Sequence, residues 1–374
     1  MARSYASATK TQLAHHMKES NILNFVKNFT PNWYATTMGT GITAICLNTL
    51  TPFFAWLSPI ATGLWLLNIM LFLFFTLVLL CQSILHPEAW WRLLHHPTQA
   101  MFLGCIPMGL MTIVNGFVLF GGLFFGAFAI HIASLLWWLD TFLSILSVLV
   151  VPYCMFTRQQ HALESMTAVW LLPFVACEVA AAGGGLLLPH LSAESVISVL
   201  LFSLVLWSIS VSLALSILVI FFHRLCIHKF PPKELAASIW LPLGPTGTGS
   251  LAMLLLGQNS LTLSAPSSEP MMHLLALLPG VGLLAGILLW ALASWWFMIA
   301  CVATVYYLVQ GQLQFNLGFW AYTFPLGVYT MATVNLGIQT DLLFFHIFGR
   351  ILVIALSLIW LSIFARTFIW KGRA

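Results

Sequence analysis

The sequence predicts an all-α integral membrane protein whose ten transmembrane helices are arranged as five helical hairpins. Three observations carry this prediction: the composition, the length of the apolar segments and the placement of the basic residues. The chain has 374 residues, of which 61% are hydrophobic and only 6% are charged. A soluble domain carries about 25% charged residues, so this chain has too few charged side chains to cover a surface that faces water.

The apolar segments have the length of membrane-spanning helices. They run for about 20 residues or more, which is what a helix needs to cross about 30 Å of hydrocarbon. They lack the alternating polarity of the shorter strands of a membrane barrel. The expected spans cover residues 31–51, 60–82, 100–121, 125–151, 168–189, 195–223, 235–257, 274–306, 316–337 and 342–368. The chain therefore divides into an N-terminal tail (1–30), with a candidate interfacial helix at 20–30, and a transmembrane domain (31–370).

The lysine and arginine residues lie on one side of the predicted membrane. Twelve of the 13 fall in the N-terminal tail, in the loops after the second, fourth and sixth spans, or at the C-terminal end. The thirteenth, Arg350, lies inside the last span, and the charged residues of the opposite loops are Glu194, Glu269 and Asp341. By the positive-inside rule we expect both termini in the cytoplasm, with the protein in the plasma (inner) membrane.

Proline and glycine are concentrated in the odd-numbered spans. The residues expected to break or kink these spans are Gly39, Gly41, Pro107, Gly109, Pro173, Pro242, Gly244, Pro325 and Gly327. Irregular backbone at membrane depth is tolerated only where protein buries it or where it lines a water-filled cavity. We therefore predict an inner ring of kinked odd helices around a central pore, with straighter even helices outside. The alternative, that these residues serve only close helix packing, leaves the segregation into odd spans unexplained.

The predicted pore lining is polar but almost without charge. The odd spans hold no lysine or arginine and one acid, Glu178. Hydroxyl groups such as those of Thr40 and Thr246, together with the positive ends of half-helices, would hold an anion weakly without a formal cation, although a neutral solute fits the same hydroxyls. A charged Glu178 at mid-membrane costs about 2.5–3.5 kcal/mol, so we expect it to be protonated or paired. Proton coupling and a structural hydrogen bond are its two alternative roles.

Enzymatic and metal-binding functions are disfavoured. The sequence has no HExxH, no GxSxG and no pair of carboxylates at helical spacing. The segment Gly244-x-x-Gly247-x-Gly249 has neither the preceding strand nor the following Lys-Ser/Thr of a phosphate loop. The seven cysteines are scattered and form no CxxC pair. We expect no enzyme activity, no cofactor, no metal and no nucleic-acid partner.

Stretches from all five odd spans carry a family resemblance. They are WYATTMGTGITAICL (33–47), FLGCIPMGLMTIVNG (102–116), MTAVWLLPFVACEVAAAGGGLL (166–187), FPPKELAASIWLPLGPTGTGSLAMLLLG (230–257) and FNLGFWAYTFPLGVYTMATVNLG (315–337). The chain resembles the tellurite-resistance/dicarboxylate transporter (TDT) family, within the TehA, slow-anion-channel and voltage-dependent anion channel superfamily. It looks closest to the malate-permease and sulfite-exporter branch. The resemblance implies ten helices around a pore and a homotrimer with one pore in each subunit.

The resemblance also implies a function and a gate. The pore of the family is blocked at its middle by a phenylalanine of the ninth helix, which corresponds here to Phe324, and Phe174 is the candidate for a second aromatic from the fifth helix. Transport of a small anion is therefore expected, with a C4-dicarboxylate (malate) as the main substrate. Sulfite export and a passive channel for nitrate or chloride are the alternatives. Glu178 departs from the uncharged fifth helix of a simple anion pore and would favour proton-coupled transport if it faced the lumen.

Overall fold

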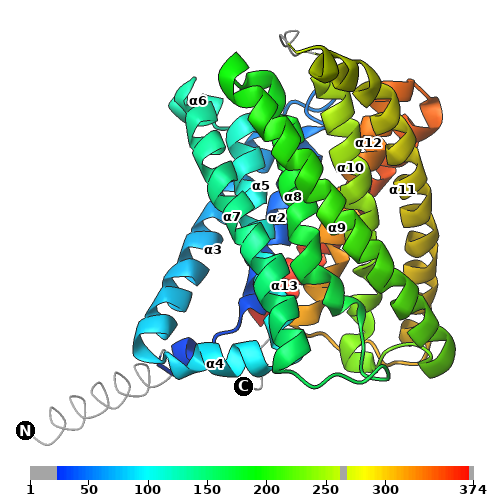
Figure 1. Ribbon diagram of the computed structural model, residues 1–374. Helices are drawn as coiled ribbons and strands as arrows, with labels where there is room; N and C mark the ends of the chain where they lie inside the picture. Colours follow the sequence, from blue (N-terminus) through cyan, green and yellow to red (C-terminus); the bar gives the residue numbers. More distant parts are fainter. Residues whose placement is uncertain (1–22, 262–267, 370–374) are drawn as a thin grey trace, which may run out of the picture.

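The computed structural model describes residues 23–261 and 268–369, and its regular elements in these ranges are all helical (Figure 1). Eight of the described helices are long and apolar enough to cross a membrane. The predicted class, an all-α integral membrane protein, is thereby confirmed. The first and ninth predicted spans, 31–51 and 316–337, are not among these eight helices, so the count of ten spans stays a prediction.

Each odd span consists of a 3-10 segment followed by an α-helix, and each even span is one long α-helix. The odd spans are η1 (Pro31–Trp33) with α2 (Tyr34–Asn48), η2 (Gln99–Gly104) with α5 (Cys105–Leu119), η3 (Ala168–Leu171) with α8 (Leu172–Leu187), η5 (Lys233–Trp240) with α10 (Leu243–Ser260), and η6 (Leu317–Tyr322) with α12 (Phe324–Thr340). The even spans are α3 (Leu57–Leu85), α7 (Phe128–Thr157), α9 (Ala193–His228), α11 (Glu269–Val309) and α13 (Leu343–Ile369). The connections contain α4 (Glu88–His95), α6 (Gly122–Phe125) and η4 (Leu188–His190).

The prolines of the odd spans lie where the 3-10 segments give way to α-helix, and they do not kink the helices in the middle. Pro107, Pro173 and Pro325 lie in the first turns of α5, α8 and α12, and Pro242 directly precedes α10. In a first turn the missing proline N–H removes no helical hydrogen bond. The prolines therefore fix where each inner α-helix begins, which corrects the expectation of mid-helix kinks.

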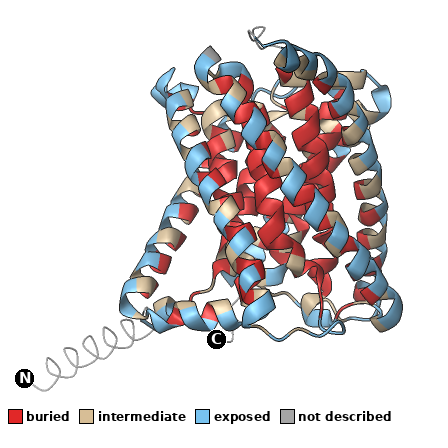
Figure 2. Cartoon of the chain, viewed as in Figure 1, coloured by how far each residue is buried: buried red, intermediate tan, exposed pale blue. Residues whose placement is uncertain are grey.

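The five odd helices form a closed inner ring. Helix α2 packs on α5, α5 on α8, α8 on α10, α10 on α12, and α12 returns to α2. Each also packs on the even helix that follows it, which makes the five hairpins. In the apolar window of Ala168–His190, which contains α8, 94% of the residues are buried, whereas in that of α11 only 17% are. Figure 2 shows the same contrast between a buried centre and an exposed outer layer, so the predicted inner and outer layers are confirmed.

The start of the described chain is attached to the bundle. Residues 23–27 are helical, within the segment predicted as an interfacial helix. Gln82 of α3 donates hydrogen bonds from Nε2 to the carbonyl oxygens of Lys27 (3.1 Å) and Phe29 (2.9 Å). Most of the predicted tail, residues 1–22, lies outside the described residues.

Gly104 allows the entries of α5 and α8 to approach each other closely. A Cβ atom at residue 104 would overlap the backbone carbonyl oxygen of Leu172, which cannot rotate away. We expect Gly104→Ala to destabilise the protein by about 1–3 kcal/mol, the usual cost of overpacking. Thermal unfolding in detergent measures this loss. Gly63→Ala is the control, because nothing lies within 4 Å of its Cβ position, and equal unfolding midpoints for the two variants would contradict the close approach.

Candidate functional site

A cavity of about 520 Å³ lies inside the ring, at the end where all five odd spans begin. Polar side chains lie around its mouth: Asn32, His96, Gln99, Glu234 and Asn316. Apolar side chains from the first turns of the inner helices lie deeper: Met38, Cys105, Met108, Leu172, Val175 and Phe324. The cavity is therefore a funnel from a polar entrance to an apolar floor.

Side chains at the mouth cap the 3-10 segments that surround it. His96 Nδ1 accepts hydrogen bonds from the backbone N–H groups of Thr98 and Gln99, both at 3.2 Å. Asn316 Oδ1 accepts one from the N–H of Gly318 at 2.8 Å, and Asn316 Nδ2 donates to the carbonyl oxygen of Glu234 at 3.2 Å. These bonds satisfy the first backbone donors of η2 and η6 and tie η6 to η5, so the entrance is held in shape by its own polar residues.

The cavity is electropositive through helix orientation and not through charged side chains. All five inner helices point their N-terminal ends at it, because residues from the start of each one line it. Each helix end carries a partial charge of about +0.5. No lysine or arginine occurs among the described residues that line the cavity, and Glu234 lies at its mouth. An anion would therefore be attracted weakly, which permits its release.

Backbone N–H groups at the starts of the inner helices are paired. The N–H of Leu241 donates to Ser238 O (3.0 Å), that of Gly244 to Leu241 O (2.8 Å), and that of Gly327 to Thr323 O (2.9 Å). The first two bonds span three residues, as in a 3-10 turn, and the third spans four residues, as in an α-helix. The contribution of the backbone at these residues is therefore the helix dipole and not a set of free donors.

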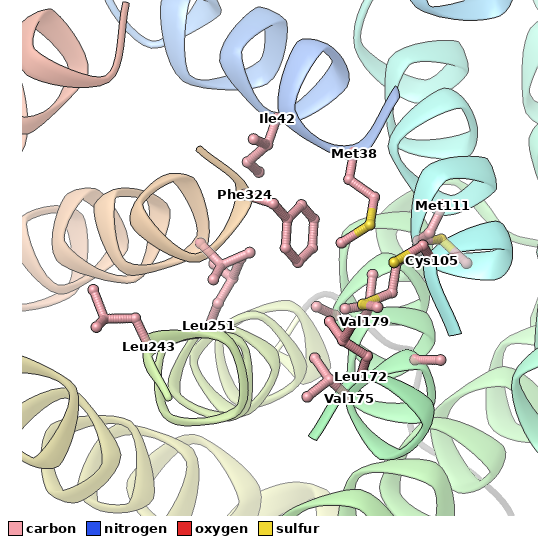
Figure 3. Packing of buried hydrophobic residues seen from close by; sticks show 14 of the residues in the cluster. Met38, Ile42, Cys105, Met111, Leu172, Val175, Val179, Leu243, Leu251 and Phe324 are labelled. Carbon is pink, nitrogen blue, oxygen red and sulfur yellow. The ribbon is translucent and has the colours of Figure 1, made fainter. Parts of the chain in front are cut away.

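The inner end of the cavity is closed by an apolar layer around Phe324. This side chain is 3% exposed, and its ring points into the space between the five inner helices (Figure 3). The figure shows the layer around it, contributed by the other four ring helices: Met38, Ile42, Cys105, Met111, Leu172, Val175, Val179, Leu243 and Leu251. The labelled side chains of this layer are all apolar.

Three of the residues predicted for the pore line the cavity, namely Phe324, Pro325 and Gly244. A Cβ built on Gly244 would meet only Val175 Cγ1, at 3.9 Å, so this glycine borders open space. Pro107, Pro173 and Pro242 are buried beside the lining and do not belong to it.

The other predicted glycines lie at helix–helix contacts. Their Cβ positions face a neighbouring helix: Gly39 faces Thr323, Gly41 faces Thr112 and Asn68, Gly109 faces Thr37, and Gly327 faces Ile42. The two predicted hydroxyls are also engaged in packing. Thr40 Oγ1 accepts a hydrogen bond from Trp360 Nε1 of α13 (3.1 Å), and Thr246 Oγ1 donates to the carbonyl oxygen of Pro242 (2.7 Å).

Phe174 and Glu178 are on α8 but are not among the residues that line the cavity. The carbonyl oxygen of Phe174 accepts a hydrogen bond from Ser210 Oγ of α9 (2.7 Å), and the next residue, Val175, takes the cavity position. Glu178 is 0% exposed, and its Oε2 lies 3.0 Å from the Cβ position of Gly249 on α10. Its neighbour Val179 lies on the lumen side of α8 (Figure 3).

The apolar floor and the polar mouth of the cavity were not predicted from the sequence. Cys105 and Met108 of α5, and Leu172 and Val175 of α8, are pairs three residues apart, which places each pair on one helix face. This spacing was readable in the sequence. It did not identify a lumen, because apolar residues at helical spacing also face lipid or a neighbouring helix.

Comparison with known proteins finds similarity over most of the chain. A sequence model of the voltage-dependent anion channel family matches residues 28–368. A sulfite efflux pump of Arthroderma otae is 36% identical over 348 residues, covering 91% of this chain and 90% of that protein. A sulfite efflux pump of Trichophyton rubrum gives the same identity and coverage. A malic acid transport protein of Schizosaccharomyces pombe is 23% identical over 348 residues, covering 90% of this chain and 77% of that protein.

Proposed function

Since this chain belongs to the voltage-dependent anion channel family, we propose that it exports sulfite through the centre of its helix ring. The observation that carries the proposal is the similarity to sulfite efflux pumps over nine-tenths of both chains. A family of transporters and channels also favours transport over enzyme activity.

Malate, the main substrate expected from the sequence, becomes the second candidate. The malic acid transport protein shares 23% identity with this chain, against 36% for the sulfite pumps. A C4-dicarboxylate carries two separated carboxylates, which proteins commonly bind with arginine pairs. No arginine occurs among the described residues that line the cavity. The weakly electropositive funnel therefore suits a small compact anion better.

The proposed transport path starts at the cavity mouth. Basic residues of the loops near this end, such as Arg158, Lys229 and Lys233, raise the local anion concentration. The anion enters the funnel and binds near the positive N-terminal ends of the inner helices. Beyond this point, the side chain of Phe324 closes the path. Displacement of this ring opens the apolar layer, and the anion leaves on the other side.

The proposal also includes the cellular arrangement. The cavity mouth and both termini face the cytoplasm of a cell whose plasma membrane holds the protein, in agreement with the positive-inside rule. An anion that enters from the mouth is then exported. We further propose a homotrimer with one path in each subunit, on the basis of the family resemblance alone.

Flux into and out of proteoliposomes tests the substrate. We expect sulfite flux to exceed malate flux by about tenfold or more, which corresponds to about 1.4 kcal/mol of difference in the barrier. Labelled sulfite and labelled malate are measured in parallel, with protein-free liposomes as the control for leakage. Faster malate flux would replace sulfite by malate as the substrate, and no flux of either anion above leakage would refute the proposed function.

A further inference from the structure

Two carboxyl groups are buried behind α8, on flanks that do not line the cavity. Asp140 of α7 and Glu178 of α8 are both 0% exposed. Both lie close to the thiol of Cys177. Ser144 Oγ is 3.4 Å from Asp140 Oδ2 and 3.2 Å from the carbonyl oxygen of Ala176. This places Asp140 at the level of residues 176–177, so the two carboxyls lie at nearly the same depth in the bundle.

Neither carboxyl has a compensating charge. Asp140 Oδ1 has no hydrogen-bond partner among the described residues. The Glu178 carboxyl lies beside the Ser210 hydroxyl, but that hydroxyl donates its proton to the carbonyl oxygen of Phe174, so the Glu178 oxygens receive no hydrogen bond from it. The groups that face Glu178 from α9, α10 and α11 are Ser210 and Val211, Gly249, and Leu289, none of which is charged. The Cys177 thiol is a titratable group within the electrostatic influence of both carboxyls.

The sequences of the packed helices place the nearest basic residues far away. Helices α5, α8 and α10 contain no lysine, arginine or histidine, and those of α7 and α9 that do occur lie near the helix ends, as Arg224 does. Burying an unpaired ionised carboxylate costs several kcal/mol. This closed structure is therefore compatible only with both acids in their neutral form.

The two helices that pack on the flanks of α8 carry further unsatisfied polar groups. The hydroxyls of Thr141 and Ser147 on α7 and of Ser203 on α9 are buried, and they too have no partner among the described residues. Ser203 faces Gly184 of α8, and α8 packs on both α7 and α9. Buried polar groups without a protein partner commonly bind internal water. The seam that α8 forms with α7 and α9 thus offers polar groups for water that would accompany a charged carboxylate.

Helix α8 links this seam to the gate. Val175 and Val179 lie on its lumen side (Figure 3), while Glu178 projects toward α9 and α10. Val175 lines the cavity together with Phe324, so a shift of α8 changes the width of the cavity beside Phe324.

We propose that Asp140 and Glu178 are the proton-binding groups of this transporter, and that release of their protons to water lets α8 shift and opens the path beside Phe324. This inference rests on the proposed transport function. The sequence linked proton coupling to a Glu178 side chain that faces the lumen. This proposal instead places the proton-binding groups behind α8, away from the lumen. The protonated state is the closed one, so flux rises as pH rises.

The variants Asp140→Asn and Glu178→Gln test this proposal, because each amide mimics the neutral acid. Sulfite flux is measured in proteoliposomes over a series of pH values and is expressed as the ratio of variant to wild type at the same pH. Taking this ratio removes the effect that the protonation of sulfite itself has on the flux, because that effect is the same for variant and wild type. We expect both variants to show low flux that no longer rises with pH, so that the ratio falls several-fold from the acidic to the alkaline end. Glu194→Gln is the matched control, because this carboxyl is exposed at the start of α9, and its ratio should stay constant.

A ratio that is constant with pH for Asp140→Asn and Glu178→Gln would show that the two carboxyls are only structural and would overturn the proposal. An infrared spectrum of the purified protein gives a readout that needs no transport. We expect the carbonyl band of protonated carboxylic acids in the wild type, weakened in each single variant, and its absence would also overturn the proposal. If the wild type moves no sulfite, the proposed function fails, and the infrared titration alone decides whether these acids bind protons.

Discussion

Phe324→Ala is expected to raise sulfite flux by about tenfold or more, since this would require a decrease of only about 1.4 kcal/mol in the barrier. The ring of Phe324 is 3% exposed and lies across the space between the five inner helices. Truncating a buried phenylalanine removes about 3–5 kcal/mol of packing energy. Because the ring is packed in the closed state, the truncation destabilises the closed state relative to the open one. The measurement is sulfite flux in proteoliposomes at matched protein content.

Phe174→Ala is the matched control for this prediction. Phe174 is a buried phenylalanine of another ring helix, α8, and it does not line the cavity. Its truncation costs similar packing energy without widening the path, so we expect unchanged flux. Flux that rises equally in both variants would mean that a loosened bundle leaks, and unchanged flux in a folded Phe324→Ala variant would rule out this side chain as the gate.

Gly244→Leu is expected to reduce sulfite flux by about tenfold or more, which corresponds to at least about 1.4 kcal/mol added to the barrier. The Cβ position of Gly244 meets only Val175 Cγ1, at 3.9 Å, and otherwise borders the cavity. A leucine side chain can therefore be accommodated without overlap at its Cβ, and it fills the funnel just before Phe324. We expect the unfolding midpoint to stay close to that of the wild type while flux is lost.

Gly280→Leu is the control for the blocking variant. Gly280 lies on the exposed side of α11 with nothing within 4 Å of its Cβ position, so the same substitution there should leave flux unchanged. Normal flux through Gly244→Leu would show that the anion takes a route outside this cavity.

The architecture of the bundle could be predicted from the sequence because its signal is distributed over the whole chain. Apolar segments of sufficient length give the helices, and the segregation of proline and glycine gives the inner ring. The local form of the breaks could not be predicted. Pro107 and Pro173 are equally compatible with a kink and with a first helical turn, and the choice depends on whether the preceding residues form a 3-10 segment.

The individual site residues were harder to predict, because successive residues of a helix point in directions about 100° apart. Val179 lies on the lumen side of α8, whereas Glu178, one residue earlier, projects toward α10. Glycine was ambiguous for a similar reason. At Gly244 it leaves space for the cavity, and at Gly327 it lets Ile42 of α2 approach. Both glycines are visible in the sequence. The rotation of each helix about its axis, which decides whether the glycine faces the cavity or a neighbouring helix, is not.

In the proposed mechanism, the transported anion occupies the cavity beside Phe324. Selenite, the selenium analogue of sulfite, tests it most directly, because selenium can be located by anomalous X-ray scattering in crystals grown with this anion. We predict a selenium peak inside the ring, between Gly244 and Phe324, and no such peak in Gly244→Leu. Selenium found only outside the ring, at concentrations that saturate transport, would contradict the account.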